Sequence, residues 1–178
     1  MHANERGDVS VSTAFFGHNA WANLKLLQFC ERLSDEQLDT NAPGCFGSIR
    51  DTLVHIVGAE VGYVERVNGK LPGEPPAADR FPGFETLKHD ARWASDELLE
   101  LALSARADVM VRQRSPRPTI QYPLPSLLVQ AVTHSTEHRA QVSAIITQLG
   151  IEPPDMSAWS YMRALGELHE WGEGQQGS

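Results

Sequence analysis

The chain has 178 residues, of which 41% are hydrophobic and 21% are charged, so it is long enough for one globular domain with a substantial hydrophobic core. Acidic residues outnumber Lys and Arg by 23 to 15, the net charge is −8, and no basic cluster is present, which argues against a nucleic-acid partner. No apolar run approaches the roughly 18 residues that indicate a membrane span, and the N-terminus has no apolar signal segment. We therefore expect a cytoplasmic protein without a membrane partner.

Apolar residues recur at three- and four-residue steps along most of the chain, which predicts four long helices and a short last one. The predicted helices cover about residues 10–33, 48–68, 84–105, 126–150 and 157–170. Ser34 and Gln37 are placed to form a capping box at a short helical turn, and Ser48 is placed to cap the second long helix. Gly150 is a suitable residue to end the fourth.

Two long connections separate these helices, one over residues 69–83 and one over residues 106–125. The first is rich in Pro and Gly. The second contains two short β-type runs, VMV and TIQY, which indicate a small hairpin or an irregular loop. The predicted fold is therefore an all-α four-helix bundle with long connections, a short C-terminal helix and a small hairpin before the fourth helix. The domain is expected over residues 10–170, with flexible ends at 1–9 and 171–178.

The two cysteines, Cys30 and Cys45, form no CxxC pair and have no zinc-ribbon spacing. We expect both to be reduced and partly buried thiols. Any metal site in this chain would therefore be built without sulfur.

Two histidines of the fourth helix, His134 and His138, lie four residues apart, so their rings lie on one side of the helix with Cβ atoms about 5–6 Å apart. Helical geometry puts Leu127 and Ile145 on the same side, which indicates that both rings face the interior. A buried ring nitrogen without a partner costs about 1–3 kcal/mol. Either these are core histidines with hydrogen-bond partners, or they bind one metal ion, for which the spacing is suitable.

A metal site needs a third ligand, and His55 is the best candidate because it lies inside the second predicted helix. It is outside that helix's apolar stripe, on a side where the neighbouring residues are small: Ser48, Thr52, Gly58, Ala59 and Gly62. His55 therefore points either to solvent or into a cleft where small side chains leave room. Glu60 falls within the apolar stripe, and we expect it to pair with an Arg of a neighbouring helix, with a role in the site as the alternative.

Three stretches carry a resemblance: HNAWANLKLL in the first helix, GSIRDTLVHIVGAEVGYVERVNG in the second, and AVTHSTEHRAQVSAIITQLGIEPPD in the fourth. In this order and at this spacing they resemble the DinB-like (DinB/YfiT) superfamily of bacterial metal-binding four-helix proteins. The resemblance spans about residues 12–165. The family often has Gly after the His–Arg pair, where this chain has Ala140. The extra methyl group of Ala140 should slightly reduce the space between the packed helices there without removing the ligands.

The resemblance implies a divalent metal ion held by three histidines, which in this chain are His55, His134 and His138. Gln141 lies beside the pair on the fourth helix, where it would orient a ligating imidazole, and Arg139 would form a salt bridge rather than bind the metal. Imidazole binds several divalent metals, so we expect zinc or nickel, with iron and manganese as alternatives.

Three neutral imidazoles would leave open positions on the ion, which is typical of a catalytic metal site. Such an ion can activate a bound water or stabilise a bound thiolate. The resemblance implies a thiol S-transferase that adds a low-molecular-weight thiol to an electrophile; the alternatives are a metal-dependent hydrolase and a non-catalytic metal-binding stress protein. We expect a small-molecule substrate and a homodimer, the latter partly by resemblance and partly because bundles with exposed apolar helix edges commonly pair. The sequence identifies no general base.

Overall fold

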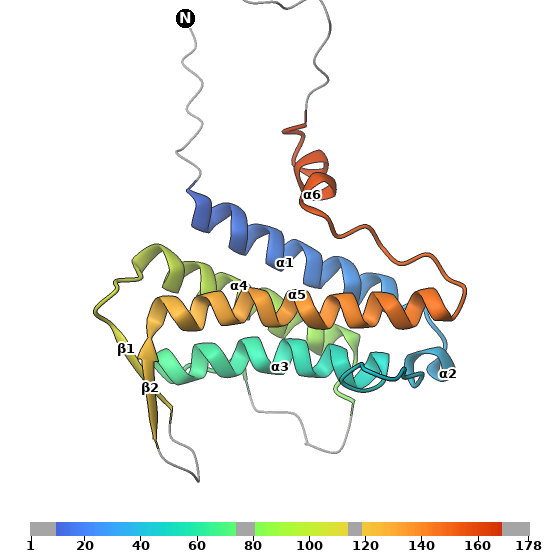
Figure 1. Cartoon of the computed structure of the whole chain (residues 1–178), viewed down its shortest axis with the longest axis horizontal. Helices are drawn as coiled ribbons and strands as arrows, with labels where there is room; N and C mark the ends of the chain where they lie inside the picture. The colour runs from blue at the N-terminus through green and yellow to red at the C-terminus, as the bar shows by residue number, and fades with distance from the viewer. Residues whose placement is uncertain (1–9, 74–80, 114–118, 169–178) are drawn as a thin grey trace, which may run out of the picture.

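The structure is a computed structural model that describes residues 10–73, 81–113 and 119–168. Four long helices lie alongside one another (Figure 1): α1 (Val11–Cys30), α3 (Ile49–Asn68), α4 (Phe84–Ser104) and α5 (Leu124–Gln148). The short elements are α2 (Asp35–Leu38), α6 (Ala158–Ala164), β1 (Met110–Gln113) and β2 (Ile120–Pro123). The helix α2 and the antiparallel β1–β2 hairpin lie at opposite ends of the bundle, and α6 contacts α1. The predicted fold class, an all-α bundle with a short C-terminal helix and a small hairpin, is confirmed.

Local sequence signals explain most helix ends. Ser34 and Ser48 both form capping boxes, with Gln37 and Asp51 as the reciprocal partners. Gly150 follows α5 in the left-handed conformation, at φ 74°, which a residue with a side chain adopts only under strain. The predicted flexible ends, 1–9 and 171–178, lie outside the described residues.

Several helix boundaries differ from the prediction by two residues or more: α1 ends at Cys30 instead of residue 33, and α5 ends at Gln148 instead of residue 150. Two further differences have a clear physical reason. The helix α5 begins at Leu124, about two residues earlier than expected. Pro125 is tolerated in its first turn because backbone N–H groups there have no partner within the helix, so the N–H that proline lacks is not missed. The last helix was predicted to reach residue 170, but α6 ends at Ala164 and Gly166 follows with φ 70°. Apolar spacing continues past this point in Leu165 and Leu168, yet both side chains are exposed. The apolar spacing after α6 therefore does not mark a buried helix face.

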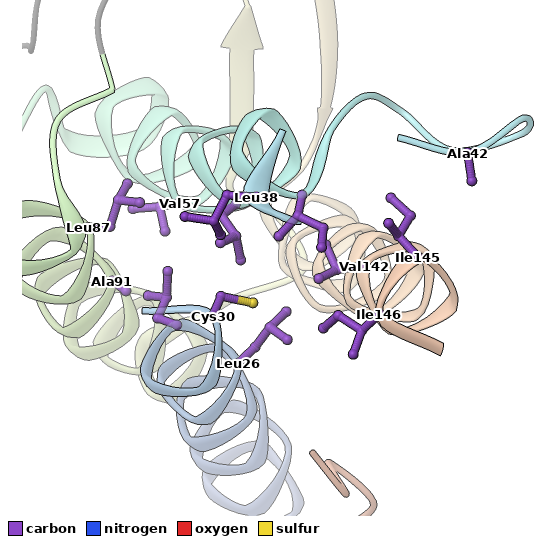
Figure 2. Close-up of a cluster of buried hydrophobic side chains, with 13 residues drawn as sticks. Leu26, Cys30, Leu38, Ala42, Val57, Leu87, Ala91, Val142, Ile145 and Ile146 are labelled. Carbon is purple, nitrogen blue, oxygen red and sulfur yellow. The ribbon is translucent and has the colours of Figure 1, made fainter. Parts of the chain in front are cut away.

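The hydrophobic core is divided into two clusters. The first lies toward the α2 end of the bundle, where side chains from all four long helices and α2 meet (Figure 2). Its largest fully buried members are Leu26, Leu27, Ile49, Leu53, Val142, Ile145 and Ile146. The second lies toward the hairpin and contains Phe16, Tyr63, Val64, Leu98, Val111, Leu124, Leu127, Leu128 and Ala131.

A layer of buried polar side chains separates these two clusters along α1, α3 and α5. Glu60 of α3 is fully buried, and its Oε1 accepts hydrogen bonds from Asn19 Nδ2 at 2.7 Å, Asn23 Nδ2 at 2.9 Å and Ser135 Oγ at 2.7 Å. Arg139 Nη1 donates to the side-chain oxygens of the same two asparagines, at 2.7 and 2.6 Å. We call these five residues the polar layer.

The expected pairing of Glu60 with an Arg of another helix is indirect. Within the described part of the chain, the carboxylate of Glu60 and the guanidinium of Arg139 form no direct ion pair; Asn19 and Asn23 connect them. Burial raises the pKa of Glu60, and burial lowers the pKa of Arg139 to about 10. The polar layer thus fastens α5 to α1 and α3 at the height where the histidines lie.

Candidate metal site

The three histidines selected from the sequence come together between α3 and α5. One nitrogen from each ring of His55, His134 and His138 lies within 4.8 Å of the others, close enough for one ion to bind all three. The Nε2 atoms of His55 and His134 are 3.0 Å apart. The three ring centroids are 4.4 to 4.8 Å from one another. Of the two orientations considered for His55, the structure does not show free exposure to solvent: the ring is half-buried beside the other two histidines.

The face of α5 that points into the core is rotated by about one residue from the predicted face. His134 and His138 are only half-buried, whereas Ser135 and Arg139, the residues that follow them, occupy the core. The helix therefore directs its polar-layer residues inward and its histidines toward His55 of α3. Half-burial leaves one side of the cluster accessible to a small molecule.

Burial lowers the pKa of His55 and of His134, and the neighbouring His138 lowers both further. A lowered pKa keeps these imidazoles neutral near pH 7. Neutral imidazole is the form that binds a metal, so ligation by these two rings would not require removal of a proton at this pH.

Gln141 holds one of the three rings in place. Its Oε1 accepts from His138 Nδ1 at 2.9 Å and from the backbone N–H of Phe46 at 3.0 Å. Because this oxygen is an acceptor, Nδ1 of His138 carries the proton and Nε2 keeps its lone pair. His134 has no equivalent partner: its Nδ1 is buried without a hydrogen bond to any described residue.

The sequence analysis missed Phe46, which lies just before α3. Its ring stacks on His55, with centroids 3.9 Å apart and planes 13° apart, and meets His138 edge-on at 5.3 Å. The side chain is nevertheless 53% exposed, so it covers the histidines on the solvent side. A loop aromatic has no periodicity to reveal it; the available signal was its place between two glycines just before the helix that carries His55.

The donor set fits a divalent transition metal. Three imidazole nitrogens on two helices, with no carboxylate or thiolate in the group, match the imidazole-rich sites of zinc and similar ions. The nearby Cys45 is not part of this group, and its Sγ contacts the backbone oxygen of Gln141 at 3.8 Å. Neither this cysteine nor Cys30 forms a disulfide.

Comparison with known proteins agrees with this geometry. The model of the DinB family matches residues 4–173. The chain belongs to the DinB family. Protein DinB of Bacillus subtilis (strain 168) is 26% identical over 163 residues, which cover 83% of this chain and 92% of that protein. The DinB resemblance found in the sequence is thus confirmed, and the three-histidine group is compatible with a metal-binding DinB-like protein. Within the described ranges, no helix is long and apolar enough to cross a membrane.

Proposed function

We propose that this DinB family protein is a metal-dependent enzyme of the thiol S-transferase type, in which His55, His134 and His138 hold one divalent ion. The observation that carries the proposal is the convergence of one nitrogen from each of three half-buried imidazole rings within 4.8 Å. When bound, the ion would supply a positive centre that stabilises a low-molecular-weight thiol as its thiolate. Zinc or nickel is the metal we favour, with iron or manganese as alternatives.

The residues around the ligands have separate tasks in this proposal. The hydrogen bond from His138 to Gln141 keeps Nε2 of that ring available for the ion. Phe46 covers His55 and limits the access of water, so that a bound thiol and its electrophile would lie in a partly dry groove. The three-histidine group contains no carboxylate, and Glu137 acts on His134 electrostatically.

Two other functions use the same site. A hydrolase would place water rather than thiol on the ion. A non-catalytic stress protein would bind the metal without turnover.

Elemental analysis of protein purified without added metal tests the site itself. We expect about one equivalent of metal in the wild type, loss of that metal in His134→Ala, and no loss in His89→Ala. His89 is a suitable control because it is exposed on α4 and bound only to its neighbour Asp90. Stoichiometric metal retained by His134→Ala would contradict the assignment.

Activity assays then separate the three functions. Incubation of the loaded protein with thiols and a panel of electrophiles should give the conjugate. Hydrolysis of esters or amides without any thiol transfer would favour the hydrolase, and metal binding without either reaction would favour the stress protein.

We also propose that two copies pair through an apolar face. Val11, Phe15 and Val129 are exposed large side chains that line one groove of about 460 Å³ between α1, α4 and α5. A second copy of the chain would cover this face, as the exposed apolar edges of helical bundles commonly do. Light scattering should give the mass of a dimer for the wild type and of a monomer for Val129→Glu; a wild-type monomer would contradict the proposal.

A further inference from the structure

A second cavity lies toward the hairpin end of the bundle, between α3, α5 and the two strands. It has a volume of about 300 Å³. Residues of α3, α5 and both strands line it: Tyr63, Arg66, Gln113, Tyr122, Ser126, Leu127 and Gln130. Six of these seven side chains carry a polar group, although Tyr122 and Gln113 hydrogen-bond to each other. The cavity is therefore apolar in part and has a few polar groups at its wall, as ligand sites commonly do.

One residue, Tyr63, connects the cavity with the candidate metal site. The ring of Tyr63, which lines the cavity, meets the ring of His134 edge-on with centroids 6.1 Å apart. Gln130, another lining residue, lies one helical turn before His134 on α5. A molecule with one end at the histidines would therefore reach this cavity past the ring of Tyr63.

One face of α3 leaves room for such a molecule. His55, Ala59, Gly62 and Arg66 follow one another at three- and four-residue steps, so all four lie on the same face of the helix. Between the imidazole and the guanidinium, this face carries only a methyl group and a hydrogen atom. The small residues that the sequence placed beside His55 thus form the floor between the two functional groups.

The side chain of Arg66 is directed along this floor. A Cβ atom built on Gly62 would lie 3.9 Å from Nη2 of Arg66, so the guanidinium folds back over the preceding turn, toward His55. Its carbon lies 5.3 Å from the centroid of the Tyr63 ring. Within the described ranges Arg66 forms no ion pair and no hydrogen bond, and the stacking on Tyr63 leaves its N–H groups available.

We propose that this cavity binds the carboxylate end of the molecule whose other end reaches the metal, with Arg66 as the anchor. The inference rests on the proposed function, because it assumes that the reacting end lies at the histidines. Guanidinium binds carboxylate through two parallel hydrogen bonds, and Gln130 and Ser126 add further polar groups at the cavity wall. Eleven residues separate His55 from Arg66, about 16 Å along the helix, and the folded-back side chain leaves roughly 10 Å for the ligand.

A matched pair of thiols tests this inference on the cobalt-loaded protein. We use 6-mercaptohexanoate and 6-mercaptohexan-1-ol, which have the same length and differ in charge at the far end. Binding is followed by the near-ultraviolet absorption band of thiolate bound to cobalt. In the wild type we expect the carboxylate thiol to bind at least about tenfold more tightly than the alcohol. The ratio should fall to about one in Arg66→Gln and remain partly above one in Arg66→Lys.

Arg32→Gln is the matched control. Arg32 is also exposed, and its guanidinium carbon also lies 5.3 Å from the centroid of an aromatic ring three residues earlier, Phe29, but it is at the end of α1 and outside the cavity. We expect it to keep the wild-type ratio. Equal binding of the two thiols to the wild type, or a ratio that survives in Arg66→Gln, would overturn the inference and leave the proposed function intact. Bound cobalt without a thiolate band for either thiol would overturn the thiol-transferase proposal and this inference with it.

Discussion

At the scale of single residues, the hydrogen bond between Gln141 and His138 connects the candidate metal site to the loop before α3. We expect Gln141→Leu to weaken zinc binding by about 10- to 100-fold, because the ring of His138 loses the acceptor that fixes its orientation and its tautomer. Gln141→Glu keeps an acceptor and should bind zinc nearly as well as the wild type. Competition with a chromophoric chelator measures both affinities.

Gln148→Leu provides the control for that prediction, because Gln148 is exposed at the end of α5. Its zinc affinity should equal that of the wild type. An unchanged affinity in Gln141→Leu would show that the hydrogen bond does not orient a ligand.

The two cysteines should differ in reactivity. Burial raises the pKa of Cys30 to about 12, whereas Cys45 is half-buried near the site. Thiolate is the reactive form, so at pH 8 iodoacetamide should modify Cys45 in the native protein and reach Cys30 only after unfolding in urea. Peptide mass spectrometry measures both, and native Cys45→Ser should stay unlabelled. Rapid labelling of Cys30 in the native protein would mean that the interior near α2 opens readily.

At the scale of helices, the polar layer is the feature whose loss should cost most. Glu60→Ala leaves the buried Arg139 without a compensating carboxylate, and we expect it to lower the free energy of unfolding by about 3–5 kcal/mol. Glu60→Gln keeps an oxygen that accepts from Asn19, Asn23 and Ser135, so its cost should be smaller. Urea unfolding followed by circular dichroism measures both.

Glu65→Ala serves as the reference for helix propensity and charge, because Glu65 is exposed on the same helix. Its effect should stay within about 0.5 kcal/mol. If Glu60→Ala were no more harmful than this reference, the polar layer would not stabilise the bundle.

The helices and the shared side of His134 and His138 could be predicted from the sequence for a physical reason: both depend on spacing along one helix. His55 lies on another helix, and its place beside the pair was inferred with the help of the family resemblance. Caps such as Ser48 depend on a few neighbouring residues, and the facing pair His134 and His138 depends on a four-residue step. Contacts between different helices and loops could not be predicted in this way. Phe46 reaches the site through a loop conformation, and Arg66 acquires its setting only when the hairpin closes the groove, so periodicity says nothing about either.

At the scale of the whole molecule, metal binding should raise thermal stability. An ion that binds only the folded state adds about 2.7 kcal/mol when its free concentration is 100 times Kd, which for a chain of this length corresponds to a Tm increase of roughly 5–10 °C. Chelation should remove this increase in the wild type. His134→Ala should show the same Tm with and without the chelator. Scanning calorimetry measures the difference, and a wild-type Tm insensitive to chelation would contradict metal binding by the folded chain.

Glu60 and Arg139 lie between the two hydrophobic clusters, and this position also restricts axial shifts of the long helices relative to one another. An axial shift of α5 by one turn, about 5.4 Å, would move Arg139 into one of the hydrophobic clusters. Its hydrogen-bond partner Asn19 would then be buried without that bond. Only one axial alignment of α5 against α1 and α3 therefore keeps these buried polar groups hydrogen-bonded. The empty and loaded proteins should superimpose closely along these helices, so the imidazole cradle is already in place before any ion arrives.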